Sequence, residues 1–338
     1  MLTGCLIGLG RMGITHYSIL NTHPDVRLTA VCDPQKALLN GLKKFKEIET
    51  FTDYRKLFSA ARPDFAIVCT PTASHIEIGE AAAEQGTHVF MEKPFSLSLS
   101  EGTELVKVAE NAGLVSQVGY FLRFHSVFNA VKQILDDGVI GAVSHYKNEM
   151  YGRTVLKPSK VSWRAKKKMG GGCMMDFGSH CLDLSDYFFG AVSEVRGSLL
   201  KSIYSAEVED AFFTQLVHHD GIVGSISVNW SDESYRRPYN RIEILGEKGK
   251  VIVDRQEFRL YLREDDPRGR FEKGWNVRYL PELEKGARFI VRGPEFTEQL
   301  DHFIDAVKNK NPNTRCTFED ASRTDRVMDM IREEGVRC

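Results

Sequence analysis

Short apolar runs alternate with amphipathic stretches along the first third of the chain. The runs at residues 4–10, 28–33, 65–71 and 88–94 are rich in apolar and β-branched residues and are bounded by Gly, Pro or Asp, which is typical of buried strands. Between them, residues 15–23, 36–45, 75–86 and 100–113 have helical character. This order of elements predicts a parallel sheet with helices on both faces.

A two-residue alternation of polar and apolar positions begins near Ala142. Turn sequences such as HHDG and GEKG separate several of these segments, which favours antiparallel neighbours and a second domain with a large antiparallel sheet. The segment 264–289 is too polar to assign, and two helical stretches, 294–309 and 318–334, end the chain. The alternating segments are residues 143–151, 193–204, 210–219, 221–230, 241–254 and 257–264.

Composition narrows the class of protein. The 338 residues are enough for about two domains, and a 42% hydrophobic content can supply their cores. No apolar run approaches the roughly 18 residues of a membrane span, and no basic segment precedes the first strand, so we expect a cytoplasmic protein. A formal net charge of -1 gives no reason to expect nucleic acid or a membrane as a partner.

The cysteines indicate reduced, mostly buried thiols. Their number is odd, they form no CxxC pair, and the first three lie in apolar runs that resemble strands. The seven cysteines are Cys5, Cys32, Cys69, Cys173, Cys181, Cys316 and Cys338.

The sequence GLGRMG directly follows the first predicted strand and opens a helix. Gly8, Gly10 and Gly13 have the spacing of a dinucleotide-binding turn, in which the backbone approaches a diphosphate at the positive end of the helix dipole. Asp33, twenty residues after Gly13, can accept hydrogen bonds from a ribose and repel a 2′-phosphate. We therefore expect NAD rather than NADP. The observation against this choice is a nearby cation, Lys36. The alternative is a glycine-rich turn without a ligand.

Two polar stretches follow later strands of the same sheet, at strand ends where open α/β sheets bind ligands. The stretch CTPTASH leads from one strand into a helix, and MEKPFS ends the next strand. Pro94 imposes an extended or turn conformation on Lys93 and raises the chance of a cis bond. Lys93 then either points into the cleft beside the nicotinamide or lies in solvent.

Asp176, His180 and Asp183 follow three consecutive glycines in the sequence GGGCMMDFGSHCLDL. Asp176 and His180 are four residues apart, so on a helix they share a face, and histidine suits proton transfer near neutral pH. A structural helix start is one alternative. A metal site that adds Cys173 and Cys181 is another, although the spacing is not that of a common structural zinc site. Asp183, one turn beyond His180, is expected to be structural.

Seven basic residues and no acidic residue occupy the segment between Met150 and Met175. This basic segment is either solvated surface or the rim of a site for an anionic substrate, because it leads directly into the predicted catalytic helix. Tyr151 and Trp163 either stack on a ring of the substrate or pack in the fold. One basic loop is not the groove with repeated stacking platforms that single-stranded nucleic acid needs. The basic residues are Arg153, Lys157, Lys160, Arg164, Lys166, Lys167 and Lys168.

The sequences GLGRMGITH, TPTASH, EKP and GGGCMMDFGSHCLD occur in the order and approximate spacing of the glucose-fructose oxidoreductase, inositol dehydrogenase and MocA family, which the chain resembles over essentially its whole length. VGYFLRF and EFTEQLDHFIDAV also resemble it. The resemblance implies a Rossmann dinucleotide-binding domain over residues 1–120. It implies an α/β domain with an open, mainly antiparallel sheet over residues 121–338, with the terminal helix able to pack back on the first domain. It also implies an active site between the domains and a homodimer or homotetramer.

In that family the Lys of EKP and the Asp and His of the later element lie around the substrate hydroxyl and carbon. The resemblance therefore implies that His180 accepts or donates the proton, Lys93 polarises the reacting oxygen and Asp176 assists. Tyr120 and Arg123 lie at the entry to the second domain and either contact substrate or have a structural role. The expected cofactor-binding residues are Gly8, Gly10, Arg11, Met12, Gly13, Asp33, Thr70, Pro71, His75, Glu92 and Lys93. The expected substrate-binding residues are Lys93, Tyr120, Arg123, Tyr151, Trp163, Arg164, Asp176 and His180, and no metal ligand is expected.

Together these features predict an NAD-dependent oxidoreductase. It is expected to transfer hydride between nicotinamide and a ring secondary alcohol of a sugar, cyclitol or nucleotide sugar, the substrate being anionic if the basic segment binds it. One alternative is a lyase or glycosidase that uses NAD transiently, and its sign would be turnover without net NADH. Another is a sensor that binds the nucleotide but does not catalyse. Against the sensor, a pure binding module would not need Lys93, Asp176 and His180 together.

Overall fold

The chain forms two compact units, which a computed structural model describes over residues 1–44, 47–158 and 162–337. Lys160 and Cys338 lie outside the described residues. The chain enters each unit twice. Unit 1 consists of residues 1–121 and 286–325, and unit 2 of residues 122–285 and 326–338.

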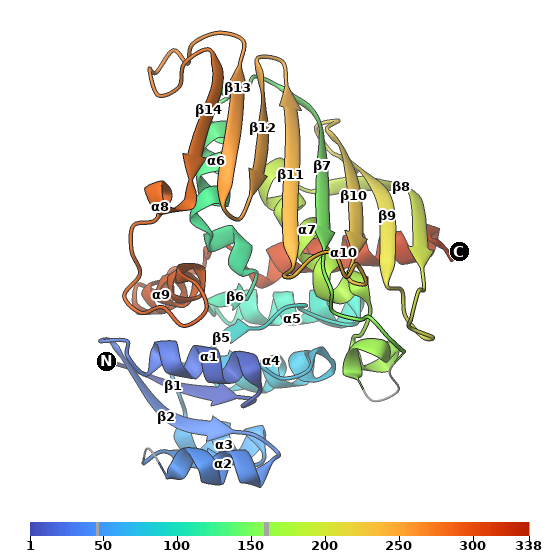
Figure 1. Ribbon diagram of the computed structural model, residues 1–338. Helices are drawn as coiled ribbons and strands as arrows, with labels where there is room; N and C mark the ends of the chain where they lie inside the picture. Colours follow the sequence, from blue (N-terminus) through green and yellow to red (C-terminus); the bar gives the residue numbers. More distant parts are fainter. Residues whose placement is uncertain (45–46, 159–161, 338) are drawn as a thin grey trace. The chain divides into compact units, whose positions relative to one another are not determined.

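Unit 1 is built on a parallel sheet whose six described strands have the order β3-β2-β1-β4-β5-β6 (Figure 1). This is the strand order of a doubly wound dinucleotide-binding fold. The strands are β1 (Leu2–Ile7), β2 (Val26–Cys32), β3 (Glu49–Phe51), β4 (Phe65–Val68), β5 (His88–Met91) and β6 (Ser116–Val118). The helices are α1 (Arg11–Leu20), α2 (Lys36–Lys43), α3 (Tyr54–Ala61), the 3-10 turn η1 (Thr72–Ser74), α4 (His75–Glu84), α5 (Leu99–Asn111) and α9 (Pro294–Lys308).

The strands of unit 1 are apolar on both sides because helices cover both faces of the sheet. In β1, Cys5 and Ile7 belong to a core cluster with residues of α3, α4 and α5. Leu6, between them, belongs to a second cluster with residues of α1, α2 and α9. Successive side chains of a strand point to opposite faces, so the uninterrupted apolar run is what this position requires.

Helix α9 packs in unit 1, although it lies far beyond the Rossmann segment in the sequence. Leu300, Phe303 and Ile304 of α9 lie in the same core cluster as Leu6 and Ile19. The spacing of its apolar residues predicts that the helix is buried, but not which sheet it covers. The last helix, α10 (Phe318–Glu334), begins in unit 1 and ends in unit 2.

Unit 2 is built on a mixed sheet of nine described strands in the order β14-β13-β12-β11-β7-β10-β9-β8-β15. Neighbours are antiparallel except for the pairs β7–β10 and β8–β15, so the prediction of an open, mainly antiparallel sheet is confirmed. The strands are β7 (Val143–Tyr151), β8 (Val192–Lys201), β9 (Ala211–His218), β10 (Val223–Asn229), β11 (Tyr239–Gly246), β12 (Gly249–Asp254), β13 (Glu257–Leu262), β14 (Gly274–Tyr279) and β15 (Val336–Arg337). β14 lies in the segment that was too polar to assign.

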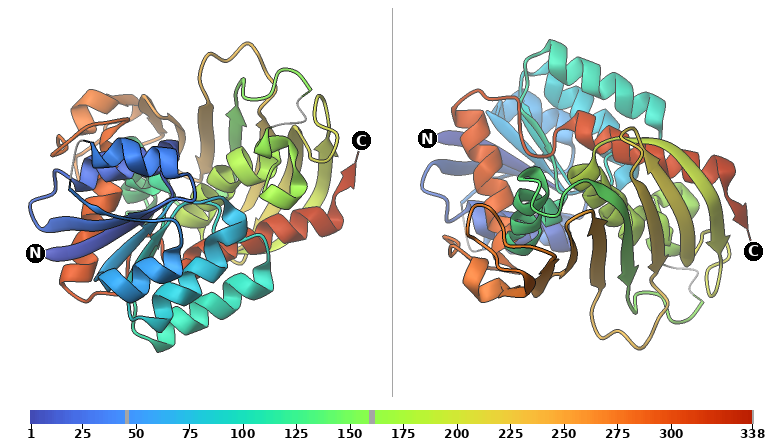
Figure 2. Two further views of the ribbon diagram at one scale, coloured as in Figure 1. Left: turned by 90° about the horizontal axis from the view of Figure 1, so that it is seen from below. Right: turned by 90° about the horizontal axis from the view of Figure 1, so that it is seen from above.

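One face of the sheet in unit 2 is covered by α6 (Ser126–Asp136) and α7 (Ser179–Phe189), and no described helix covers the other face (Figures 1 and 2). In β7, Tyr146 and Asn148 are buried, whereas Lys147 is exposed. Asn148 Nδ2 donates to the Cys181 carbonyl oxygen at 2.9 Å, which fixes α7 on the sheet. The remaining elements are the 3-10 turns η2 (Phe121–Phe124), η3 (Trp163–Ala165) and η4 (Lys167–Met169), the π-helix η5 (Met174–Gly178) and α8 (Leu280–Leu283).

Among the helices of the described residues, none has the length and apolar character that crossing a membrane requires.

Candidate active site

The glycine turn after β1 is closely packed at two of its glycines and open at the third. Gly8 has a φ of +96°, and a Cβ there would lie 2.7 Å from the Cys69 carbonyl oxygen. A Cβ at Gly13 would lie 1.9 Å from the Gly8 carbonyl oxygen, whereas no atom lies within 4 Å of the Cβ position at Gly10. Gly10 is the N-cap of α1, whose first turn has no acidic residue and whose cap has no side-chain hydrogen bond. These first-turn amides and the space beside Gly10 fit a diphosphate.

Asp33 is tied to the glycine turn. Its Oδ2 accepts the backbone N–H of Leu9 at 2.7 Å, and its Oδ1 accepts that of Gln35 at 2.8 Å. Each carboxylate oxygen has a second acceptor position, so buried Asp33 can still accept a hydrogen bond from a ribose hydroxyl. Lys36 lies exposed at the start of α2. The arrangement fits the adenosine end of a dinucleotide beside the turn that holds its diphosphate.

Glu92 and His16 connect the strand end that carries Lys93 with helix α1. The Lys93–Pro94 bond is cis, in line with the expectation from the sequence. Glu92 Oε2 accepts the backbone N–H of Lys93 at 3.3 Å, and Glu92 Oε1 lies 2.6 Å from Nε2 of His16, which is fully buried. The Glu92 carboxylate, predicted to bind the cofactor, therefore contacts the protein itself. Through these contacts it can position Lys93 relative to the glycine turn.

His75 joins the two loops that follow β4 and β5. Its Nδ1 lies 3.0 Å from the Pro94 carbonyl oxygen, and its Nε2 lies 3.0 Å from that of Thr70. Burial lowers the pKa of His75, an effect that its hydrogen bonds to backbone carbonyl oxygens oppose. Both ring nitrogens face backbone carbonyl oxygens, which supports a role in loop geometry more than the predicted contact with the cofactor. Pro71 of the same loop is exposed.

Close approaches by a backbone oxygen and by a side-chain carboxylate explain two of the three consecutive glycines in unit 2. A Cβ at Gly171 would lie 2.3 Å from the Arg164 carbonyl oxygen. Gly172 has a φ of +116°, and a Cβ there would lie 2.4 Å from Oε1 of Glu209. The Gly172 N–H also donates to the Arg164 carbonyl oxygen at 3.0 Å. The glycines thus let the basic segment and a carboxylate reach the start of the following helix.

Asp176 lies in the π-helix Met174–Gly178, which runs directly into α7 with His180. The sequence predicted one continuous helix, and the π-turn is the difference; such turns are frequent at functional sites. The Asp176 side chain is 15% exposed and accepts a hydrogen bond from Arg164 Nε at 2.9 Å. The Arg164 guanidinium lies 4.7 Å from the centroid of the Trp163 ring. Trp163, Arg164 and Asp176 are therefore adjacent, and His180 is 6% exposed on the helix that follows.

Glu209, which the sequence did not identify, contacts the start of the π-helix that carries Asp176. Its Oε1 accepts the N–H of Met174 at 2.9 Å, and its carbonyl oxygen accepts the N–H of Cys173 at 3.0 Å. Burial raises the pKa of the Glu209 carboxyl, an effect that the hydrogen bond from the Met174 N–H opposes. Glu209 therefore holds the first turn of the helix that carries Asp176 from the other side of the glycines. No local pattern marks this role, because the partners lie far apart in sequence.

Two predicted substrate-binding residues have roles inside their own units. Tyr120 is fully buried in a core cluster of unit 1. Arg123 is 3% exposed, and its Nε donates to Asp183 Oδ1 at 2.9 Å and its Nη2 to Asp186 Oδ2 at 3.2 Å. These placements support the structural alternative for Tyr120 and Arg123, and they fit the structural role expected of Asp183.

Tyr151 lies on the opposite face of its sheet from α7. Tyr146 of the same strand stacks on Phe189 of α7, with ring centroids 4.2 Å apart. Five residues later the strand alternation turns Tyr151 to the uncovered face, where its hydroxyl lies 2.6 Å from Ser227 Oγ. Tyr151 therefore does not join Asp176 and His180, and its placement does not support the predicted substrate contact.

The basic segment is largely in contact with solvent. Arg164 is paired with Asp176, and Lys160 lies outside the described residues. The exposed basic residues are Arg153, Lys157, Lys166, Lys167 and Lys168.

The cysteines near Asp176 are poorly suited to bind a metal. Cys173 and Cys181 are fully buried, and burial raises the pKa of both thiols, which opposes the thiolate form that metals need. The described residues contain no group of three or more His, Cys, Asp or Glu side chains arranged to hold a metal ion. The cysteines in this part of the chain are free thiols.

Two family profiles and the curated relatives identify the family. The profile "Oxidoreductase family, NAD-binding Rossmann fold" matches residues 3–120, and "GFO/IDH/MocA C-terminal domain" matches residues 128–252. Inositol 2-dehydrogenase of Rhizobium meliloti is 30% identical over 259 residues, which cover 74% of this chain and 75% of that protein. The chain belongs to the GFO/IDH/MocA oxidoreductase family. The resemblance seen in the sequence is confirmed.

Other GFO/IDH/MocA relatives differ in their named reactions. Myo-inositol 2-dehydrogenase of Thermotoga maritima is 28% identical over 321 residues, covering 91% of this chain and 88% of that protein. The 2,7-anhydro-N-acetylneuraminate hydratase of Escherichia coli is 27% identical over 261 residues, covering 75% of this chain and 67% of that protein.

Solved structures with the same fold include two dehydrogenases. Levoglucosan dehydrogenase in complex with NADH has a TM-score of 0.86 at 21% identity, covering 98% of this chain and 96% of that one. The WlbA dehydrogenase from Bordetella pertussis, in complex with NADH and UDP-GlcNAcA, has a TM-score of 0.86 at 22% identity, covering 98% of this chain and 95% of that one. These matches confirm the predicted fold class.

As a GFO/IDH/MocA protein with the family's NAD-binding Rossmann fold, the chain is an NAD-dependent oxidoreductase, which confirms the predicted enzyme class and cofactor. Its residues fit NAD, because Gly10 leaves space at the start of α1 and Asp33 keeps acceptor positions beside the same turn. The roles of individual site residues stay predictions.

Proposed function

We propose that this protein transfers hydride between NAD and a ring secondary alcohol of a carbohydrate or cyclitol. The observation that carries the proposal is the π-turn of unit 2, which presents Asp176 ahead of the buried His180 and pairs Asp176 with Arg164. An acid–base group and a fixed carboxylate are what oxidation of a hydroxyl-rich substrate needs. The relatives named inositol 2-dehydrogenase support this reaction class.

The proposed mechanism separates proton and hydride. Bound NAD supplies the acceptor for the hydride that leaves the substrate carbon. His180 takes the hydroxyl proton, and Lys93 stabilises the negative charge that develops on the oxygen. Arg164 fixes the Asp176 carboxylate, which accepts a hydrogen bond from a second hydroxyl and orients the ring. In the reverse direction His180 returns the proton to the alkoxide oxygen.

The substrate class is tested first by nicotinamide reduction. The purified protein is assayed with NAD and with NADP against neutral inositols and hexoses beside sugar acids, sugar phosphates and UDP-sugars. We expect turnover with NAD and much less with NADP, because the Asp33 carboxylate repels a 2′-phosphate. Turnover confined to the anionic compounds would assign the exposed lysines 166–168 to substrate binding, since a positive rim attracts and holds an anion. Turnover of neutral inositols would show that the basic segment is solvated surface.

A second reading is a lyase or hydratase that uses NAD transiently. The relative named 2,7-anhydro-N-acetylneuraminate hydratase favours it, because that protein is similar in sequence to this chain but is named for a different reaction. Product formation without accumulation of NADH would establish this reading. NAD binding without turnover of any compound in either assay would favour the sensor.

Glu209→Ala should lower kcat about tenfold or more without changing the dissociation constant of NAD. The variant removes the acceptor of the Met174 N–H and frees the glycines that position Asp176. Glu209→Gln keeps an oxygen in the same place and should recover most of kcat. Steady-state kinetics and an NAD titration measure both effects. An equal loss of kcat in the two variants would contradict the positioning role of Glu209. Unchanged kcat in Glu209→Ala would show that Glu209 has no such role.

A homodimer or homotetramer and a cytoplasmic location stay predictions. The uncovered face of the sheet in unit 2 supports an oligomer, since it carries Tyr151, Tyr239 and Tyr261 and the exposed Trp275.

A further inference from the structure

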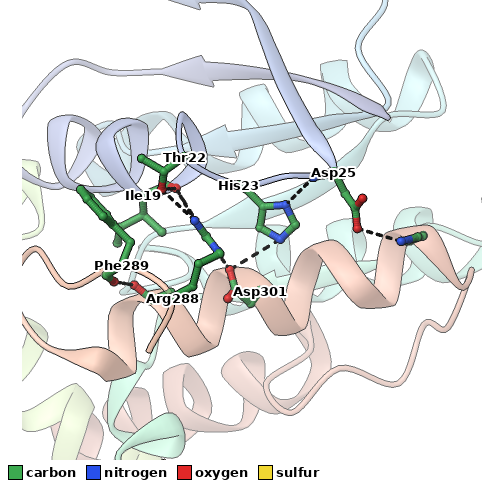
Figure 3. Close-up of polar contacts among 9 residues, drawn as sticks. Ile19, Thr22, His23, Asp25, Arg288, Phe289 and Asp301 are labelled. Atoms are coloured by element: carbon green, nitrogen blue, oxygen red, sulfur yellow. Dashed lines mark hydrogen bonds and ion pairs between the residues drawn. The ribbon is translucent and has the colours of Figure 1, made fainter. Parts of the chain in front are cut away.

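Residues 286–293, here called the strap, enter unit 1 from outside the Rossmann sequence and lead into α9. Arg288 anchors the strap: its Nη1 donates to Thr22 Oγ1 at 2.7 Å and its Nη2 to Asp301 Oδ1 at 2.8 Å. Figure 3 shows Arg288 between the turn that follows α1, at Thr22, and α9, at Asp301. One cation therefore ties the strap to both helices.

The other end of the strap is fixed at the start of α9. Thr297 Oγ1 donates to the Phe289 carbonyl oxygen, which holds the strap against the first turn of the helix. Phe296 stacks on Phe121 of unit 1, with ring centroids 4.7 Å apart. These contacts hold the backbone of the strap at Arg288 and Phe289 and at the start of α9.

The fixed strap places Arg292 beside the glycine turn. The Arg292 guanidinium lies 5.5 Å from the centroid of the Phe296 ring, and its Nη1 lies 3.7 Å from Sδ of Met12. Met12 is the second residue of α1, whose first turn has no acidic residue and no side-chain cap. A delocalised cation thus lies one side chain away from the amides that fit the diphosphate.

We propose that Arg292 is a further NAD-binding residue, which contacts the diphosphate from the side opposite the α1 amides. A guanidinium suits this position because its planar donors match phosphate oxygens in pairs. A phosphate between the strap and α1 is then held by helix amides on one side and by a charged side chain on the other. The inference rests on NAD binding by unit 1 and not on the identity of the substrate.

The test compares three ligands on Arg292→Gln without any substrate. Isothermal titration measures binding of NAD, ADP-ribose and adenosine to the variant and to the wild type. NAD and ADP-ribose, which carry the diphosphate, should bind about fivefold to tenfold more weakly, since a partly exposed charge-assisted contact is lost. Adenosine, which carries no phosphate, should bind nearly as before. Arg27→Gln, which removes an exposed arginine from β2 of the same unit, should leave all three affinities unchanged.

Three results would overturn the inference. Unchanged NAD affinity in Arg292→Gln would show that Arg292 does not contact the cofactor. An equal loss for adenosine would show that the residue acts on the fold or the adenosine end. An equal loss in Arg27→Gln would show a general charge effect. Failure of the wild type to bind NAD would instead contradict the cofactor assignment, so the two failures are distinguishable.

Discussion

His180→Ala should retain NAD binding and lose turnover by about two to four orders of magnitude, the usual contribution of a positioned general acid or base. The loss should appear in kcat, because the imidazole takes the proton that leaves as hydride transfer begins. In the variant, the substrate hydroxyl has to lose its proton to water before hydride transfer, and a hydroxyl buried in the site has poor access to water. Steady-state oxidation of the best substrate and an NAD titration measure the two effects separately.

The fold of this variant has to be checked, since His180 is 6% exposed and its loss leaves a small cavity. A thermal unfolding scan in the presence of NAD shows whether unit 2 still folds. His219→Ala removes an exposed histidine from unit 2 and should keep full turnover, which controls for the loss of a histidine as such. Unchanged turnover in a folded His180→Ala protein would remove His180 from the mechanism.

The parallel sheet of unit 1 could be predicted from the sequence because local signals coincide. Each strand is a short apolar run, each helix has its own periodicity, and Gly8 marks the turn where the backbone requires a positive φ. The return of α9 to unit 1 could not be predicted in this way. An apolar stripe with Leu300, Phe303 and Ile304 fixes which side of a helix is buried, but the choice of sheet depends on long-range packing.

The candidate site likewise contains residues whose placement the sequence can predict and residues whose placement it cannot. Asp176, His180 and Lys93 are carried by short local motifs, so the sequence can name them. Arg123 is different, because its two carboxylate partners lie about sixty residues away and only the folded chain shows that its charge is neutralised within unit 2. The alternation along the strand places Tyr151 on the face opposite to Tyr146, but the sequence does not show which of the two faces is left uncovered.

The glycines of the nucleotide turn are required for different reasons. Gly13 is required by packing within the protein, and Gly10 is required by the space for a ligand. Gly13→Ala should destabilise unit 1, because the new Cβ would lie 1.9 Å from a backbone oxygen that no side-chain movement can relieve. We expect a loss of about 1–3 kcal/mol or more, the usual range for overpacking. Gly10→Ala should leave stability nearly unchanged, since its φ of −67° and ψ of −174° suit any residue and no atom lies near the Cβ position.

Gly10→Ala should nevertheless weaken NAD binding strongly, by about a hundredfold or more, because the methyl group would stand where the backbone approaches the diphosphate. Thermal unfolding of the apo protein and NAD titration measure stability and affinity independently. ADP-ribose should lose as much affinity as NAD, whereas adenosine should lose little. If Gly10→Ala bound NAD as tightly as the wild type, the space beside Gly10 would not be the diphosphate site. A Gly10→Ala protein that unfolded as easily as Gly13→Ala would show that both glycines serve packing within unit 1.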